Sequence, residues 1–231
     1  MPIYRASSLL GRKISTSDGE VGTLYDVHFS DHTWLVEHLI VETGTYFHHR
    51  RLIVDPSLIL PAIEPFDPAA PGEILLDATR DAILASPDYA TDPSVADQKA
   101  NDPRLHPRFL WMPAGDSTKL VSRPLGAPAE DLEVNDAEAF ARGHNPHLRS
   151  FREVRGYAVY ASGTSEVVLG HVKDLMVMSE SHSIVQMLIN MGNGLPEDEL
   201  AVQPCDVDRI DWADVHVYLH RTHAEMDVPV V

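Results

Sequence analysis

Short runs of alternating apolar and polar residues, separated by turn residues, occupy the first third of the chain. Such runs predict five short strands, over residues 12–15, 21–30, 34–43, 51–54 and 74–77. Asp18-Gly19 and Asp31-His32-Thr33 supply turn residues between them, and Gly19 suits a positive φ. Leu39-Ile40-Val41 is continuously apolar, which predicts a strand that is covered on both faces.

The same order of runs returns in the last third of the chain, over residues 156–160, 167–178, 183–191, 200–202 and 215–220. An offset of 148 residues places 21–59 over 169–207 without a gap. The identical pairs are Gly22/Gly170, Asp26/Asp174, Gly44/Gly192, Leu52/Leu200, Val54/Val202 and Pro56/Pro204. With small shifts, the match also includes Leu10-Gly11 over Arg155-Gly156. These pairings indicate an internal duplication.

Five short strands without intervening helices suit a small closed barrel, which removes the exposed edges of an open sheet. We therefore expect a mainly β protein with two small β-barrels in tandem. The expected boundaries are 1–78 for the first barrel, 79–147 for a Pro-rich, partly helical connector and 148–231 for the second barrel.

The connector differs from both flanking parts in composition, with eight prolines between residues 86 and 150. Thr79 is expected to cap a short helix that ends before Pro87, and a second short helix is expected over 136–142 after Asn135. The connector also holds Tyr89, Phe109 and Trp111. We expect these aromatic residues to pack on a barrel or on a partner copy.

The net charge is -17, and each third of the chain is acidic. An acidic chain lacks the basic surface that DNA or an anionic membrane binds, so neither is expected as a direct partner.

Cys205 is the one cysteine, which excludes an intrachain disulfide. The first residues do not resemble a signal peptide, and no 18-residue apolar run predicts a membrane span. These features predict a cytoplasmic protein.

Several of these segments together resemble the PRC-barrel pattern: Leu10-Gly11, Asp18-Gly19-Glu20-Val21-Gly22, Asp26 and Leu39-Ile40-Val41-Glu42-Thr43-Gly44. PRC-barrels occur in the cytoplasmic part of the photosynthetic reaction centre H subunit and in ribosome-maturation factors. The segments 145–157, 209–212, 79–81 and 86–87 resemble a bacterial group of tandem PRC-barrel proteins. The likeness covers nearly the whole chain. It implies docking or assembly parts without shared catalytic residues, and the H subunit's membrane anchor has no counterpart here.

The second copy departs from this pattern at two loops. Residues 162–167 replace a shorter turn, and the loop over 192–197 lacks the aromatic character of Tyr46-Phe47 in the first copy. The second barrel is therefore expected to present a different surface.

The 13 histidines raise the question of a metal site. His216, His220 and His223 have helical spacing, but a strand here would point Val215, Val217 and Leu219 inward and His216, Tyr218 and His220 outward. Zinc needs three or four converging ligands, so outward histidines are the favoured interpretation. His48-His49 are expected in a loop beside Arg50-Arg51, where adjacent side chains diverge. His144 and His147 flank Pro146 and are expected to cap or pack.

Other candidate chemistry is equally sparse. Cys205 follows Pro204 without a cysteine motif, which favours an inert thiol, and no nucleophile elbow, Walker or Rossmann glycine pattern occurs. Glu197-Asp198-Glu199 is interpreted as a solvated loop. Residues 206–211 alternate like a strand and lack a calcium loop's glycine. No catalytic, cofactor-binding or metal-ligating residue is assigned, and no cofactor is expected.

The favoured hypothesis is a non-catalytic interaction or assembly module: a homo-oligomeric scaffold, such as a homodimer, that docks on a protein complex. Small barrels bury little surface alone, which favours self-association. One alternative is a ribosome- or RNA-linked assembly factor that acts through a basic protein partner. The other is a small-ligand-binding protein or enzyme that uses a cleft between the barrels.

Overall fold

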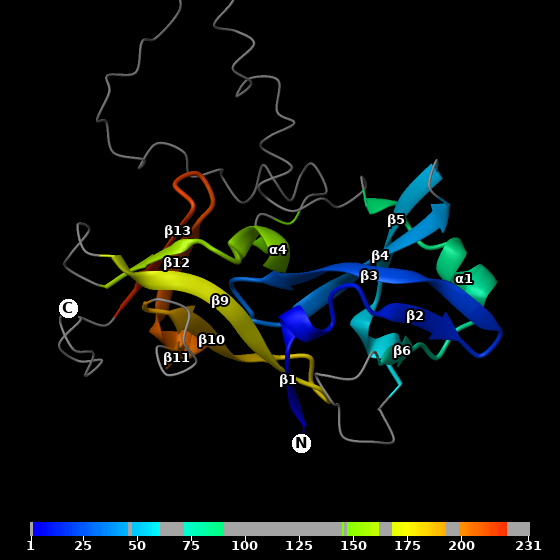
Figure 1. Ribbon diagram of the computed structural model, residues 1–231, viewed down its shortest axis with the longest axis horizontal. Helices are drawn as coiled ribbons and strands as arrows, with labels where there is room; N and C mark the ends of the chain where they lie inside the picture. Colours follow the sequence, from blue (N-terminus) through cyan, green and yellow to red (C-terminus); the bar gives the residue numbers. More distant parts are fainter. Residues whose placement is uncertain are drawn as a thin grey trace, which may run out of the picture.

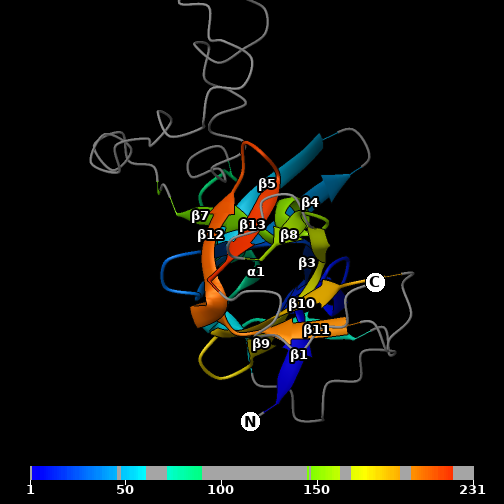
Figure 2. The same cartoon turned by 90° about the vertical axis from the view of Figure 1, so that its left-hand side faces the viewer.

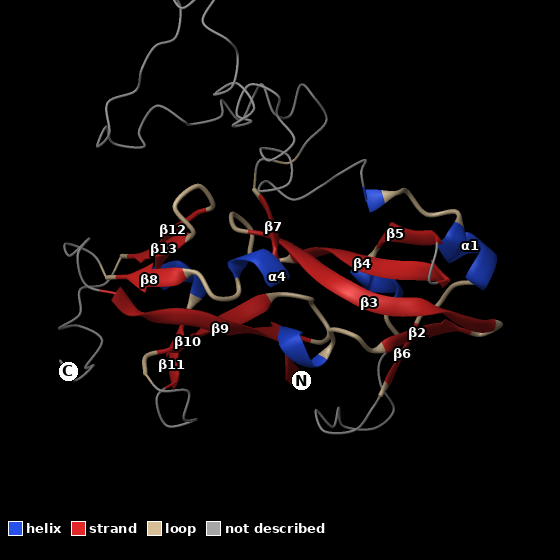
Figure 3. Ribbon diagram, turned by 45° about the horizontal axis from the view of Figure 1, so that its top comes forward, coloured by secondary structure: helices blue, strands red, loops and turns tan. Residues whose placement is uncertain are grey.

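The computed structural model describes residues 2–45, 48–60, 72–89, 145, 147–161, 168–192 and 199–220. This part of the chain is mainly β and forms two sheets with a few short helices (Figure 3). The first sheet lies on the right of Figure 1 and the second on the left.

The first sheet has the strand order β5-β4-β3-β2-β6, and β7 pairs with β3 outside this path. Its strands are β2 (Lys13–Thr16), β3 (Gly19–Ser30), β4 (Val36–Thr45), β5 (His48–Val54), β6 (Glu73–Leu75) and β7 (Leu148–Ser150). All neighbours are antiparallel except β2 and β6, which run parallel.

The second sheet has the order β11-β10-β9-β8-β13-β12, and β1 pairs with β9 outside this path. Its strands are β1 (Ile3–Arg5), β8 (Ala158–Tyr160), β9 (Val168–Met178), β10 (Ile184–Asn190), β11 (Glu199–Val202), β12 (Val207–Asp211) and β13 (His216–Leu219). Its one parallel pair is β8 with β13, which corresponds to β2 with β6 in the first sheet.

The helical elements are single turns or little more. They are the 3-10 turns η1 (Ala6–Ser8), η2 (Pro56–Leu58) and η8 (Pro204–Asp206), and the α-helices α1 (Arg80–Leu84) and α4 (Phe151–Val154). Thr79 caps α1 as expected, because its hydroxyl accepts a hydrogen bond of 3.3 Å from Ala82 N.

The ten strands expected from the apolar pattern are all present, with ends that differ by a few residues. Leu39, Ile40 and Val41 are at most 1% exposed, which confirms the doubly covered strand. Gly19 has φ 144°, which confirms the expected positive φ. The helix expected over 136–142, Phe109, Trp111 and the loops at 46–47, 162–167 and 193–198 lie outside the described residues.

Two three-residue strands were not expected, and each joins the sheet of the other half. β1 pairs with β9 through Tyr4 and Val177, and β7 pairs with β3 through Arg149 and Phe29. Figure 2 shows β1 beside β9, although the two strands are far apart along the chain. Each half therefore supplies a strand to the other, an arrangement that we call the arm exchange.

Corresponding positions of the two sheets make the same backbone contacts. Gly11 N donates to Leu24 O and Gly156 N donates to Val172 O, both at 2.8 Å. Gly11 and Gly156 both have positive φ, 77° and 99°. Ala6 and Phe151, which follow β1 and β7, are both fully buried. The equivalence therefore extends from the strands to the turns and the exchanged arms.

The two sheets also meet directly between β3–β4 and β9–β10. Val36 N donates to His182 O at 2.9 Å, and Ile184 N donates to Trp34 O at 2.8 Å. Trp34 and His182 have φ of 56° and 54°, so the same left-handed turn occurs on both sides. One cluster of buried apolar residues includes members from both sheets. The halves are thus joined by hydrogen bonds, exchanged strands and a shared core.

Candidate functional site

We call the exchanged strands β1 and β7, with the turns that directly follow them, the arms. Two buried aspartates accept hydrogen bonds from residues of these arms. Asp26 on β3 is 4% exposed and accepts hydrogen bonds from Ser150 Oγ at 2.5 Å and from Arg152 N at 3.1 Å. Asp174 on β9 is 2% exposed and accepts hydrogen bonds from the backbone N and the Oγ of Ser7. Each carboxylate also accepts from the next backbone N–H of its own strand. Asp26 and Asp174 therefore anchor the arms as buried hydrogen-bond acceptors.

A cationic side chain of each arm makes a second contact with the sheet to which the arm is joined. On the first sheet, the guanidinium groups of Arg51 and Arg152 lie 3.6 and 4.4 Å from the centroid of the Tyr25 ring. On the second sheet, Glu199 pairs with Arg5 at 2.9 Å and with Lys173 at 2.5 Å. The first arm contact is therefore a cation–π interaction and the second is an ion pair, at corresponding places of the two sheets.

Glu199 corrects the interpretation of residues 197–199 as a solvated loop. It begins β11, and hydrogen bonds from Lys173 and Arg5 hold the pKa of its carboxyl below the ordinary value. Its neighbours Glu197 and Asp198 lie outside the described residues. Apolar periodicity did not predict this role, because both cations come from strands distant in sequence.

His28 lies beside the first arm joint in an environment that is unusual for a histidine. It is fully buried, and neither ring nitrogen has a hydrogen-bond partner in the described part of the chain. Its Nε2 is 3.6 Å from Asp26 Oδ2, and the Tyr89 ring meets it edge-on at 5.5 Å. Unsatisfied buried nitrogens cost stability. The corresponding position on β9 holds Met176, an apolar residue.

We expect His28→Met to raise the free energy of unfolding by about 1 kcal/mol, because it removes two unsatisfied nitrogens. Chemical denaturation at neutral pH measures this change. The reciprocal substitution Met176→His is the matched control and is expected to lower stability. A destabilised His28→Met protein would instead indicate that the contact between His28 and Asp26 stabilises the joint.

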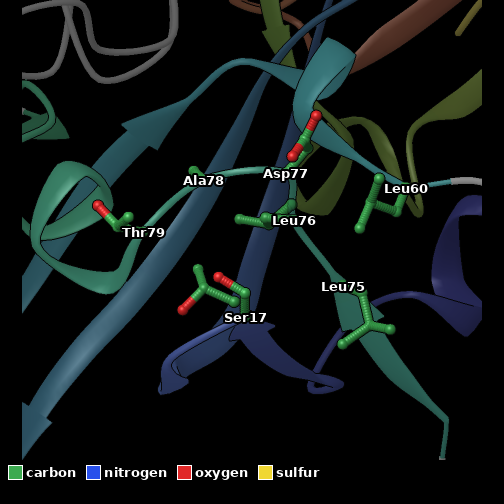
Figure 4. A pocket seen from close by; sticks show the side chains of 8 residues that line it. Ser17, Leu60, Leu75, Leu76, Asp77, Ala78 and Thr79 are labelled. Atoms are coloured by element: carbon green, nitrogen blue, oxygen red, sulfur yellow. The ribbon is translucent and has the colours of Figure 1, made fainter.

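A cavity of about 330 Å³ opens at the parallel pair β2–β6 (Figure 4). Leu60 and Leu75 on its rim are 42% and 48% exposed, and Asp77 and Thr79 supply polar groups. Thr79 already caps α1. The cavity is an amphipathic recess, to which we assign no ligand.

The corresponding strands of the second sheet carry a row of partly exposed aromatic side chains. Arg209 on β12 pairs with Tyr218 on β13, Tyr218 pairs with Tyr160 on β8, and Tyr160 pairs with Val168 on β9. Residues paired in register lie side by side on one face of a sheet. His216, two residues from Tyr218, joins the same face. We call Arg209, Tyr218, Tyr160, Val168 and His216 the aromatic face.

The side chains of the aromatic face are stacked on one another. The Arg209 guanidinium lies 4.0 Å from the Tyr218 centroid, and the Tyr218 and Tyr160 rings stack at 5.7 Å. His216 meets Tyr160 edge-on at 4.7 Å. Burial raises the pKa of Tyr218 above its ordinary value. The stacking holds large, amphipathic side chains in fixed positions on the surface.

One member of this face and one residue of the turn before β13 are exposed apolar side chains. Val168 is 43% exposed and Val215 is 48% exposed. The expectation that Val215 points inward was wrong: it lies in the turn before β13 with φ 62°. A left-handed φ is a true outlier for a β-branched residue. Val217 and Leu219 are buried, as expected.

The remaining histidine candidates are dispersed. His220 is exposed beside Asp208, and His223 and His144 lie outside the described residues. The expected loop at His48-His49 was wrong, because both residues begin β5. Pairing with β4 extends the hairpin that far.

His147 packs as the sequence suggested. Its Nδ1 is 3.0 Å from Asp31 Oδ1, and Arg149 Nε donates to the other oxygen of Asp31 at 2.5 Å.

Cys205 is exposed in η8 with its Sγ 3.6 Å from Gln203 Oε1. Residues 207–211 form β12, which confirms the strand pattern.

Within the described ranges, no three His, Cys, Asp or Glu side chains converge on a metal-sized position. None of the helices in this part of the chain is long and apolar enough to cross a bilayer. A scan against protein-family models found no matching family, and no curated protein matches the sequence.

Proposed function

We propose that this protein is a non-catalytic interaction and assembly module, a homo-oligomeric scaffold or adaptor that docks on a protein complex. The aromatic face carries this proposal. Tyrosine and arginine are enriched where protein interfaces concentrate their binding energy, and rigid stacked rings lose little conformational entropy on binding. Arg209, Tyr218 and Tyr160 present both properties on three neighbouring strands.

We further propose that the two sheets belong to a tandem of PRC-type barrels. The sequence resemblance supports this assignment, as do the matched contacts at Gly11 and Gly156 and at Trp34 and His182. In this proposal, the arm exchange makes the two barrels one rigid body. A rigid body suits a scaffold, because it fixes the relative orientation of whatever binds to its faces.

The test combines light scattering with a pull-down from native lysate at low and high salt. The purified chain is expected to have a mass of at least two copies at micromolar concentration. Arg209→Glu together with Val168→Lys, both at exposed positions of the aromatic face, is expected to weaken self-association at least tenfold. Leu35→Ala, at an exposed leucine outside this face, is the matched control and should leave the mass unchanged. A monomeric chain that captures no partner would overturn the proposal.

A further inference from the structure

The aromatic face has the dimensions and chemistry of a site for an extended peptide. Its row crosses four strands, and a spacing of about 4.8 Å per strand gives a length of roughly 14 Å. A polyproline II segment rises about 3.1 Å per residue, so about five residues match the row. Stacked tyrosines are the surfaces on which proline rings pack, and tyrosine hydroxyls donate to the peptide's free carbonyls.

The charge around the face favours a basic peptide. Asp208 and Asp211 lie on β12 and Asp214 in the turn before β13, with Arg209 as the one arginine among residues 207–216. Of these, Asp208 already pairs with Arg209, whereas Asp214 is exposed at the turn beside Val215. Carboxylates at one edge of the aromatic row therefore favour an extended segment that carries cations between its prolines.

The chain itself contains a segment with this chemistry. Residues 101–128 hold five prolines, and they carry four basic residues against two acidic ones in a chain of net charge -17. The basic residues are Arg104, Arg108, Lys119 and Arg123. Complementary charge and proline content thus meet in one segment of the connector.

Both flanks of the connector are attached to the first sheet, whereas the aromatic face belongs to the second. On one flank, Tyr89 packs on His28 of β3. On the other, Asn145 Nδ2 donates to Glu37 of β4 at 3.0 Å. We infer that residues 101–128 of one chain bind the aromatic face of a second copy. The inference rests on the proposed function, because it names the occupant of the same face.

Complementation between two full-length variants tests this exchange. One variant loses the face through Asp214→Lys and Val168→Lys, which place two cations at exposed positions where the basic segment would bind. The other loses the basic segment through Arg104→Glu, Arg108→Glu and Arg123→Glu. Each variant alone is expected to associate at least tenfold more weakly than the wild type. An equimolar mixture is expected to recover association, because one intact face then meets one intact segment.

Two further measurements sharpen the result. A synthetic peptide of residues 101–128 is expected to dissociate the wild-type dimer, and 500 mM salt is expected to weaken association relative to 50 mM. Thermal unfolding checks that each variant is folded. If the double variant of the aromatic face does not fold, Val168→Lys alone takes its place as a milder substitution.

The inference is overturned if the mixture associates no better than the separate variants. It is also overturned if the peptide at saturating concentration leaves the wild-type dimer intact, since the segment would then not occupy the face that joins the two copies. Loss of self-association in the face variant without any effect of the segment variant leaves the proposed function standing and removes only the segment as occupant.

Discussion

Alanine at Gly22 or at Gly170 is expected to destabilise the protein severely. A Cβ atom at Gly22 would lie 2.1 Å from Glu42 O, and one at Gly170 would lie 2.2 Å from Asn190 O. Both obstacles are backbone carbonyls of the adjacent strand, which side-chain rotation does not relieve. We expect each substitution to lower the free energy of unfolding by on the order of 3 kcal/mol. Thermal or chemical denaturation followed by circular dichroism provides the measurement.

Gly11→Ala is the matched control for a glycine effect that does not involve crowding. Gly11 has φ 77°, but no heavy atom lies within 4 Å of the position that a Cβ would take. Its cost is therefore the left-handed conformation alone, about 1 kcal/mol. Equal losses at Gly11 and Gly22 would contradict the explanation by close approach of the strands.

Removal of either buried carboxylate is the second change with a large expected effect. Asp26→Ala leaves the donors Ser150 Oγ, Arg152 N and Val27 N without their acceptor, and Asp174→Ala does the same to Ser7 and Leu175 N. Each unsatisfied buried donor costs about 1–3 kcal/mol, so a loss of roughly 3–5 kcal/mol is expected from either substitution. Urea denaturation measures both losses under the same conditions.

Asp18→Ala separates burial from hydrogen bonding. Asp18 accepts from Arg80 N at 2.7 Å and from Thr16 Oγ1 at 2.8 Å, yet it is exposed. Water replaces the lost acceptor there, so a much smaller loss of stability than that of Asp26→Ala is expected. If Asp26→Ala were as mild as Asp18→Ala, the arm would not depend on the buried carboxylate.

Local patterns predicted the strands and turns but not the connections between the halves. Alternation located β3 and β9, and the offset alignment placed Asp26 over Asp174. By contrast, β1 and β7 are only three residues long and pair with strands about 120 or more residues away. Their pairing depends on a tertiary docking position, which apolar periodicity does not encode.

The sequence pattern predicted only part of the aromatic face, because the rest also depends on tertiary pairing. The alternation over 215–220 placed His216 and Tyr218 on the outer side of a strand. Tyr160 and Arg209 reach the same surface only because β13 lies between β8 and β12. That neighbourhood follows from sheet order, so it became visible only in the folded chain.

The arm exchange has a consequence for how the chain matures during synthesis. The first sheet lacks β7 until residue 150 has left the ribosome, and the second sheet needs β1, which emerges long before β9. Contacts of such long sequence separation slow folding, because the ends of a large loop must meet before the contacts form. The N-terminal arm must therefore remain undocked until β9 is complete. A translational pause or truncation inside the connector is expected to yield a nascent first half with an open receptor at Asp26, which is a site for chaperones or for misassembly with another chain.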